Sequence, residues 1–66
     1  MHLTVNGEPV EVAAPPTVAQ LVLDRAPDHR RVAVAVNGDV VPRSAWDRTE
    51  LTAGDAVELL VAVAGG

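Results

Sequence analysis

Two stretches of alternating residue type in this chain are each interrupted by an Asn-Gly dipeptide. Hydrophobic residues alternate with polar ones over residues 2–5 and again over 8–12, on either side of Asn6-Gly7. Valine and alanine alternate over 32–36, directly before Asn37-Gly38. Both residues of an Asn-Gly pair adopt positive φ readily, so this pair between alternating segments predicts a tight β-hairpin turn. We therefore expect two hairpins.

The strands that return from these turns have different constraints. Pro9 has no amide hydrogen, so we expect it at the start of the second strand or on a sheet edge. The return strand of the second hairpin should be short and centred on Val40 and Val41.

A helix is predicted between the hairpins. Thr17 and Gln20 have the spacing of a capping box, in which each side chain satisfies a free amide at a helix start. Hydrophobic residues at the first, fourth and fifth positions after the threonine then share one helix face. Pro27 cannot continue the helix, so it should end by about Ala26. The residues expected to face the core are Val18, Leu21 and Val22.

The last third of the chain combines a loop with a final strand. Residues 43–55 have no sustained period and contain turn-forming residues, which predicts a connection with room for one helical turn, with Leu51 reaching the core. Residues 56–63 alternate again and predict a strand. One face would carry Val57, Leu59, Val61 and Val63, and the other Glu58, Leu60 and Ala62.

This order of elements predicts an α+β protein with the β-grasp fold. Strand, strand, helix, strand, strand, strand can form a five-strand mixed sheet with one helix packed on one face, which buries the helix stripe against the valine faces. The fold has its last strand in the centre of the sheet, parallel to the first. We expect a β-grasp domain over residues 1–63 and a flexible Gly-Gly tail over 64–66 that extends beyond the sheet.

Composition restricts the possible functions. The chain has 66 residues, no cysteine, no Phe or Tyr and a net charge of -4. A domain of this size has little room for an enclosed active site, and an acidic chain without an aromatic stacking platform is a poor nucleic-acid binder. We expect a soluble cytoplasmic protein without membrane association, because no apolar run reaches about 18 residues and the first residues lack signal-peptide regions.

The basic residues are unusual because all five are arginine. Composition bias is one explanation. The other is functional, since an activated acyl group on this chain would find no lysine amine of its own to attack.

Side chains that could carry catalysis have no recognisable arrangement. His2 and His29 lack the spacing of a zinc site, the carboxylates are scattered, and Ser44 lacks the glycines of a nucleophile elbow. We therefore expect neither catalytic residues nor a metal site, and a protein that is not an enzyme. Trp46 has two interpretations, as a cover for one end of the core or as an anchor for a partner.

The sheet face opposite the helix is a candidate docking surface. Ala33 and Ala35 of the third strand should lie beside Leu60 and Ala62 of the last one. This combination would give an apolar patch on a face that is usually polar, and exposed apolar patches mark interaction sites. Small residues that merely suit strand packing would explain the alanines equally well, but this is a weaker explanation for Leu60.

The two glycines at the end of the sequence suggest a reactive tail. Glycine has no Cβ, so an extended segment 64–66 could thread a channel about 10 Å deep, at ~3.4 Å per residue, and present its carboxylate to a catalyst. Attack of that carboxylate on ATP would give a mixed anhydride, and a sulfur nucleophile would convert the anhydride to a thiocarboxylate. A chance occurrence of two glycines is the alternative.

Several stretches together resemble the thiamin-biosynthesis sulfur carriers, the ThiS family. The stretch that ends at Trp46, followed by "L..GD.VE" and Gly-Gly, is the most specific part, and the resemblance covers essentially the whole chain. Its one mild departure, "VAGG", also ends molybdopterin-synthase small subunits, which are usually longer and contain phenylalanine. The resembling stretches are "VNGE" (5–8), "TVAQLV" (17–22), "VAVAVNGDVVPRSAW" (32–46), "LTAGDAVELL" (51–60) and Gly65-Gly66.

The resemblance implies a ubiquitin-like carrier and a set of partners. Gly66 would be adenylated and converted to a thiocarboxylate, with Gly65 as its spacer. The partners would be an E1-like adenylating enzyme of the ThiF type that uses Mg-ATP, a persulfide sulfur donor, and a thiazole synthase of the ThiG type. The carrier itself would bind no cofactor. The alternatives are a sulfur carrier for another pathway (molybdopterin, cysteine or a specialised metabolite) and a non-covalent β-grasp interaction module.

Overall fold

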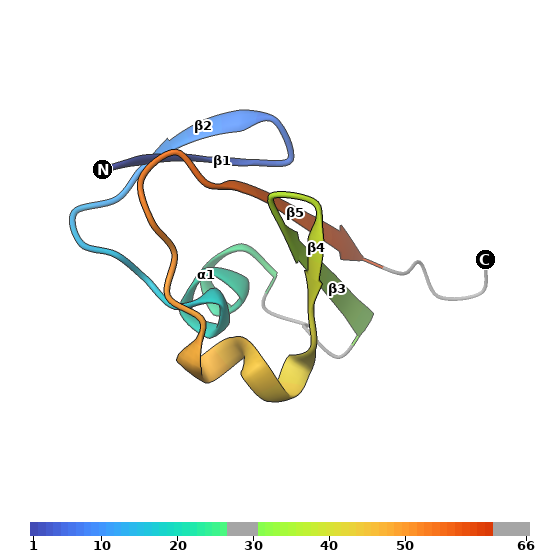
Figure 1. Cartoon of the computed structure of the whole chain (residues 1–66). Coiled ribbons are helices and arrows are strands. Elements are labelled where there is room, and N and C mark those ends of the chain that lie inside the picture. The colour runs from blue at the N-terminus through green and yellow to red at the C-terminus, as the bar shows by residue number, and fades with distance from the viewer. Residues whose placement is uncertain (27–30, 62–66) are drawn as a thin grey trace.

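The strands form one mixed sheet with the C-terminal strand in its centre. The computed structural model describes residues 1–26 and 31–61, with only the backbone at Val61. The strand order is β2-β1-β5-β3-β4, with β5 parallel to β1 and antiparallel to β3, and α1 packs beneath the sheet (Figure 1). This is the predicted β-grasp arrangement. The elements are β1 (His2–Val5), β2 (Glu8–Glu11), α1 (Val18–Arg25), β3 (Val32–Val36), β4 (Asp39–Val41), the 3-10 helix η2 (Arg43–Arg48) and β5 (Ala56–Val61).

Both predicted hairpins form at their Asn-Gly pairs. Asn6 and Gly7 have φ of 52° and 82°, and Asn37 and Gly38 have φ of 52° and 87°. Positive φ at both central positions gives the turn a twist that matches the flanking strands. Because each turn has two residues, it fixes the register of its hairpin.

The helix begins and ends where its sequence signals predict. The amide of Gln20 donates to the Thr17 hydroxyl at 3.2 Å, and the Thr17 amide donates to the Gln20 side chain at 2.9 Å, which completes the capping box. Ala26 is the C-cap residue, directly before Pro27. The three predicted core residues of the helix are buried.

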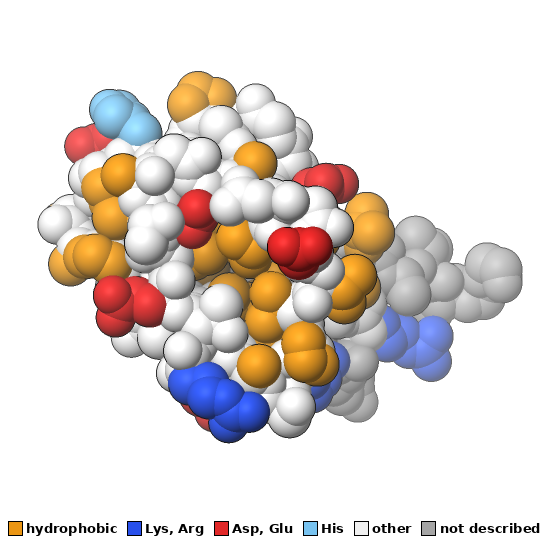
Figure 2. Space-filling view, viewed as in Figure 1, with side chains coloured by type: hydrophobic (Ala, Val, Ile, Leu, Met, Phe, Trp, Pro, Cys, Tyr) orange, Lys and Arg blue, Asp and Glu red, His pale blue; other side chains and the backbone are white. Residues whose placement is uncertain are grey.

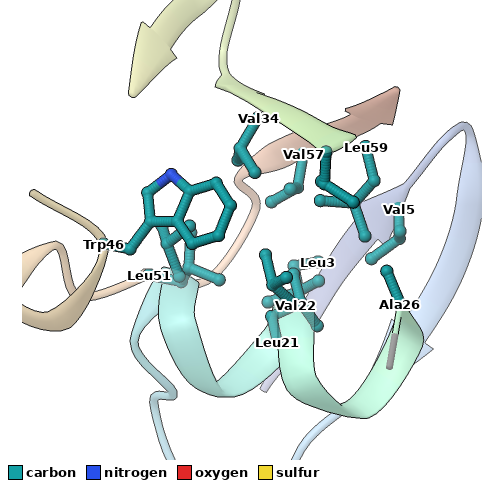
Figure 3. Close-up of a cluster of buried hydrophobic side chains, with 12 residues drawn as sticks. Leu3, Val5, Leu21, Val22, Ala26, Val34, Trp46, Leu51, Val57 and Leu59 are labelled. Carbon is teal, nitrogen blue, oxygen red and sulfur yellow. The ribbon is translucent and has the colours of Figure 1, made fainter. Parts of the chain in front are cut away.

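The hydrophobic core lies between α1 and the inner sheet face (Figure 3). Leu51 is fully buried, as predicted, and so brings the chain between η2 and β5 into the core. Trp46 is also buried, and its indole Nε1 donates to the Val41 carbonyl at 3.0 Å. The core interpretation of Trp46 is therefore correct, and a buried indole offers no anchor to a partner in this conformation.

The connection after β4 is more regular than the sequence pattern indicates. Residues 43–48 form η2, whereas the absence of a sustained period in this stretch predicts only a loop with room for one helical turn. Trp46 in this helix packs into the core, and the Arg43 guanidinium lies 4.6 Å from the centroid of its ring. Tertiary packing of the indole therefore stabilises a helix that no period in the sequence indicates.

The two edge strands are protected against pairing with other chains. Pro9 lies in β2, an edge strand, as predicted for a residue without an amide hydrogen. On the other edge, β4 is three residues long and is followed by Pro42. Short strands and prolines at sheet edges discourage edge-to-edge association. Among the described residues, no helix is long and apolar enough to cross a membrane.

Candidate functional site

The predicted tail comes after the central strand in the sequence. Gly66, its spacer Gly65 and the face residue Ala62 lie outside the described residues, as do Val63 and the proposed boundary at residues 63–64. The structure does describe β5, the strand that leads to them, between β1 and β3. The site is therefore built from β5 and its neighbours.

On one side, β5 pairs with β3 from its second residue to its last. The register runs from Val36 opposite Val57 to Val32 opposite Val61. On the other side, the ladder with β1 contains only two pairs, Thr4 with Ala56 and Val5 with Val57. The β1 side of the strand therefore depends on further contacts.

The side chains of both turn asparagines bind β5, that of Asn6 on the β1 side and that of Asn37 on the β3 side. The Asn6 Nδ2 donates to the Leu59 carbonyl at 3.2 Å, and the Leu59 amide donates to Asn6 Oδ1 at 2.8 Å. At the start of β5, the Ala56 amide donates to Asn37 Oδ1 at 2.9 Å. The turn prediction located both asparagines correctly but did not reveal that each one binds the same strand.

Asp55 secures the beginning of β5. Its carboxylate accepts hydrogen bonds from the Thr52 amide at 2.8 Å, the Thr52 hydroxyl at 3.1 Å and Asn37 Nδ2 at 3.0 Å. Hydrogen bonds to the ionised form, that from the Thr52 amide first, hold the pKa of Asp55 below its ordinary value of 3.8. The loop, the second turn and β5 are thus joined at one carboxylate.

Three of the four residues of the predicted apolar patch, Ala33, Ala35 and Leu60, are described and lie on the outer face of the sheet. Ala33 pairs with Leu60, as the alternation predicts, and Leu60 is 64% exposed. Ala35 pairs with Glu58 on one side and with Val40 on the other. We call Ala33, Ala35, Val40, Glu58 and Leu60 the outer-face patch.

Val40 is the member of this patch that the sequence reasoning missed. It is 77% exposed, more than Leu60. The signal was present, because a two-residue turn at 37–38 places Val40 opposite Ala35 and therefore on the same face. In Figure 2, hydrophobic side chains gather around the position of β4 and alternate with acidic ones.

The titratable side chains of the described residues do not converge on a catalytic centre. His2 Nδ1 lies 2.7 Å from Glu11 Oε2, at the far end of the sheet from the outer-face patch, and both side chains are exposed. No group of three or more His, Asp or Glu residues within 1–26 and 31–61 could hold a metal ion.

A sheet with its C-terminal strand in the centre, parallel to the first, and with one helix on one face defines a small ubiquitin-like β-grasp domain. The model of the ThiS family matches residues 3–66. The chain therefore belongs to the ThiS family.

Two relatives and two solved structures support this assignment. The sulfur carrier protein ThiS of Escherichia coli K12 is 30% identical, and the alignment covers all of both chains. A thiazole synthase of Paramagnetospirillum magneticum is 35% identical over 66 residues, which span 100% of this chain but only 20% of that relative. The crystal structure of the thiamine biosynthesis protein ThiS from Geobacter metallireducens superimposes with a TM-score of 0.85 at 39% identity over the full length of both chains. A solution structure of a thiamine biosynthesis protein from the same organism gives a TM-score of 0.82 at 40% identity over 100% of this chain and 88% of that one.

Proposed function

We propose that this chain is a sulfur carrier that delivers sulfur, as a thiocarboxylate on Gly66, to the thiazole moiety of thiamin. The observation that carries the proposal is the match to the family through residue 66, together with an end-to-end alignment with the sulfur carrier of E. coli. The thiamin pathway is favoured over molybdopterin, cysteine or a specialised metabolite because the relatives and solved structures named above belong to thiamin biosynthesis.

The proposed chemistry occurs on the carrier but is catalysed by its partners. The Gly66 carboxylate attacks the α-phosphorus of Mg-ATP on an E1-like adenylating enzyme, and pyrophosphate leaves. A persulfide sulfur then attacks the acyl carbon, so that the C–O bond breaks and AMP leaves. A thiol cleaves the S–S bond of the resulting acyl disulfide, which releases the thiocarboxylate and leaves a disulfide on the enzyme side. Because the first step consumes ATP, we propose a cytoplasmic location.

Gly65 is proposed to act as a spacer for this chemistry. A residue without Cβ allows an extended tail to enter a narrow channel in the adenylating enzyme. Replacement of Gly65 by valine should therefore block adenylation by steric exclusion while the fold is retained.

The outer-face patch, extended by Ala62, is the proposed docking surface for the adenylating enzyme. Leu60 and Val40 supply exposed apolar area beside two alanines, and Leu60 precedes the tail by only a few positions in the sequence, so one partner could hold both. Glu58 is the one charged member of the patch among the described residues. A complementary partner therefore presents an apolar surface with one lysine or arginine opposite Glu58, because an unpaired carboxylate in the interface would cost binding energy.

A thiazole synthase is the proposed recipient of the sulfur. The relative from P. magneticum is named thiazole synthase and is about five times as long as the stretch that aligns with this chain. A carrier-like segment within a protein of that name supports a direct partnership between the two activities.

Intact-mass spectrometry tests the function. The full chain is incubated with the ThiF-type enzyme of its host, Mg-ATP and a persulfide source, and the expected product is heavier by the difference between sulfur and oxygen. Deletion of Gly66 should abolish this gain with little change in stability, because terminal residues contribute little to a folded domain. A gain that survives the deletion, or that maps to an internal residue, would exclude the proposed carrier role. A non-covalent interaction module would show no gain at all.

A further inference from the structure

The two Asn-Gly turns bind opposite ends of the strand that leads to the tail. Asn37 binds β5 at Ala56, its first residue, and Asn6 binds it at Leu59, two residues before its end. The two asparagines have the same φ and the same following residue. The chain thus contains two similar contacts that differ in their distance from the tail.

The Asn6 carboxamide takes the place of one further residue of β1. The chain turns away after Val5, so the backbone ladder with β5 ends at the pair Val5–Val57. A carboxamide has one acceptor oxygen and one donor nitrogen, as a peptide group does. Asn6 uses both of them on the Leu59 backbone, so the ladder continues to Leu59 without a strand residue.

This contact determines how far β5 is held from both sides. Beyond Val57, the described contacts to the β5 backbone on the β1 side come from Asn6, whereas β3 pairs with β5 as far as Val61. Without the side-chain carboxamide of Asn6, the segment from Leu59 to Val61 would depend on hydrogen bonds to β3 alone. Strand ends supported on one side fray more readily, and fraying here would release Leu60 from the outer-face patch.

We propose that Asn6 is a positioning residue for adenylation, because its side chain fixes the end of β5 from which the tail starts. The inference rests on the proposed function. Among the described residues of β5, Leu59 is the last one held by Asn6 on one side while the strand pairs with β3 on the other, and Gly66 follows it by seven positions. A partner that grips Leu60 and the tail together gains from a fixed end of β5, because the cost of ordering that part of the strand is then already met in the free carrier.

The test compares Asn6→Gly with Asn37→Gly. Glycine keeps the positive φ of each turn and removes only the side-chain hydrogen bonds. The assay is carrier-dependent ATP–pyrophosphate exchange by the host's ThiF-type enzyme, with the full-length chain as the varied substrate. Thermal unfolding, followed by Trp46 fluorescence, measures the loss of stability in each variant and sets a temperature at which both are folded.

We expect Asn6→Gly to raise KM with little change in kcat, and Asn37→Gly to leave both values unchanged. If the competent end of β5 is populated less often, the apparent affinity falls by that fraction, so KM should rise about tenfold while kcat stays within about twofold. Asn37→Gly should keep the KM of the wild type at a comparable loss of stability. Amide hydrogen exchange should accelerate at Leu59 in the first variant and at Ala56 in the second.

A conservative variant keeps the test decisive if Asn6→Gly folds poorly. Asn6→Asp retains an acceptor for the Leu59 amide but sets a second carboxylate oxygen, which cannot donate, against the Leu59 carbonyl, so its KM should also exceed that of the wild type. Equal KM values for Asn6→Gly, Asn6→Asp and the wild type, or an equal increase in Asn37→Gly, would overturn the proposed positioning role. A wild-type chain that supports no exchange would instead contradict the proposed function, so the two failures are distinguishable.

Discussion

The carboxylate of Asp55 should stabilise the fold in a pH-dependent manner. It accepts three hydrogen bonds, two from Thr52 and one from Asn37, and so joins the loop before β5 to the second hairpin turn. Asp55→Ala removes all three. Since each such hydrogen bond contributes about 0.5–1.5 kcal/mol and Asp55 is half-buried, we expect the free energy of unfolding to fall by about 2 kcal/mol at neutral pH. For a domain of this size that corresponds to a decrease in Tm of about 10 °C.

The sign of the pH dependence follows from the lowered pKa. Hydrogen bonding, the Thr52 amide first, stabilises the ionised carboxyl and depresses the pKa of Asp55 in the folded protein. A group of this kind contributes stability that is complete above its ordinary, unfolded-state pKa of 3.8 and is lost as pH falls through its folded-state pKa. The stability difference between wild type and Asp55→Ala should therefore be constant near neutral pH and shrink as pH falls below about 4.

Urea unfolding, followed by Trp46 fluorescence over a range of pH, measures this difference. Trp46 is the only tryptophan and is buried, so its emission reports loss of the core. Asp39→Ala, at an exposed carboxylate in β4, controls for the change in net charge. The reasoning is refuted if Asp39→Ala loses as much stability, or if the difference for Asp55→Ala stays constant down to about pH 3.

Three further predictions concern the outer-face patch and the core. Leu60→Arg should leave the fold intact, because the side chain is exposed, and weaken binding of the adenylating enzyme by about 2 kcal/mol or more; unchanged affinity in calorimetry would contradict the docking surface. Glu58→Arg should weaken the same complex more than Glu50→Arg, which changes the net charge equally away from the patch, and equal effects would mean that only overall charge matters. Leu51→Ala, at a fully buried position, should cost about 2–5 kcal/mol in urea unfolding, and a loss below 1 kcal/mol would show that the core can close around the missing atoms.

Local residue order was sufficient to predict most of the secondary structure. The Asn-Gly pairs, the Thr17–Gln20 capping box and the position of Pro27 act over four residues or fewer, and the structure has the expected turns and helix at these places. The alternation also predicted that Leu60 and Ala33 share the outer face. Such features can be predicted from the sequence because turn and cap geometry depends on neighbouring residues in the chain rather than on the rest of the fold.

Contacts between distant segments were decided only by the tertiary structure. The Asn6 side chain reaches Leu59 across 53 positions, and no local pattern distinguishes an asparagine that only turns the chain from one that also binds a central strand. The sequence likewise allowed two roles for Trp46, and the packing of η2 against α1 and β4 selected the core. These outcomes depend on which backbone groups remain without partners once the sheet has formed, because buried or half-buried donors and acceptors must be satisfied by whatever lies nearest in space.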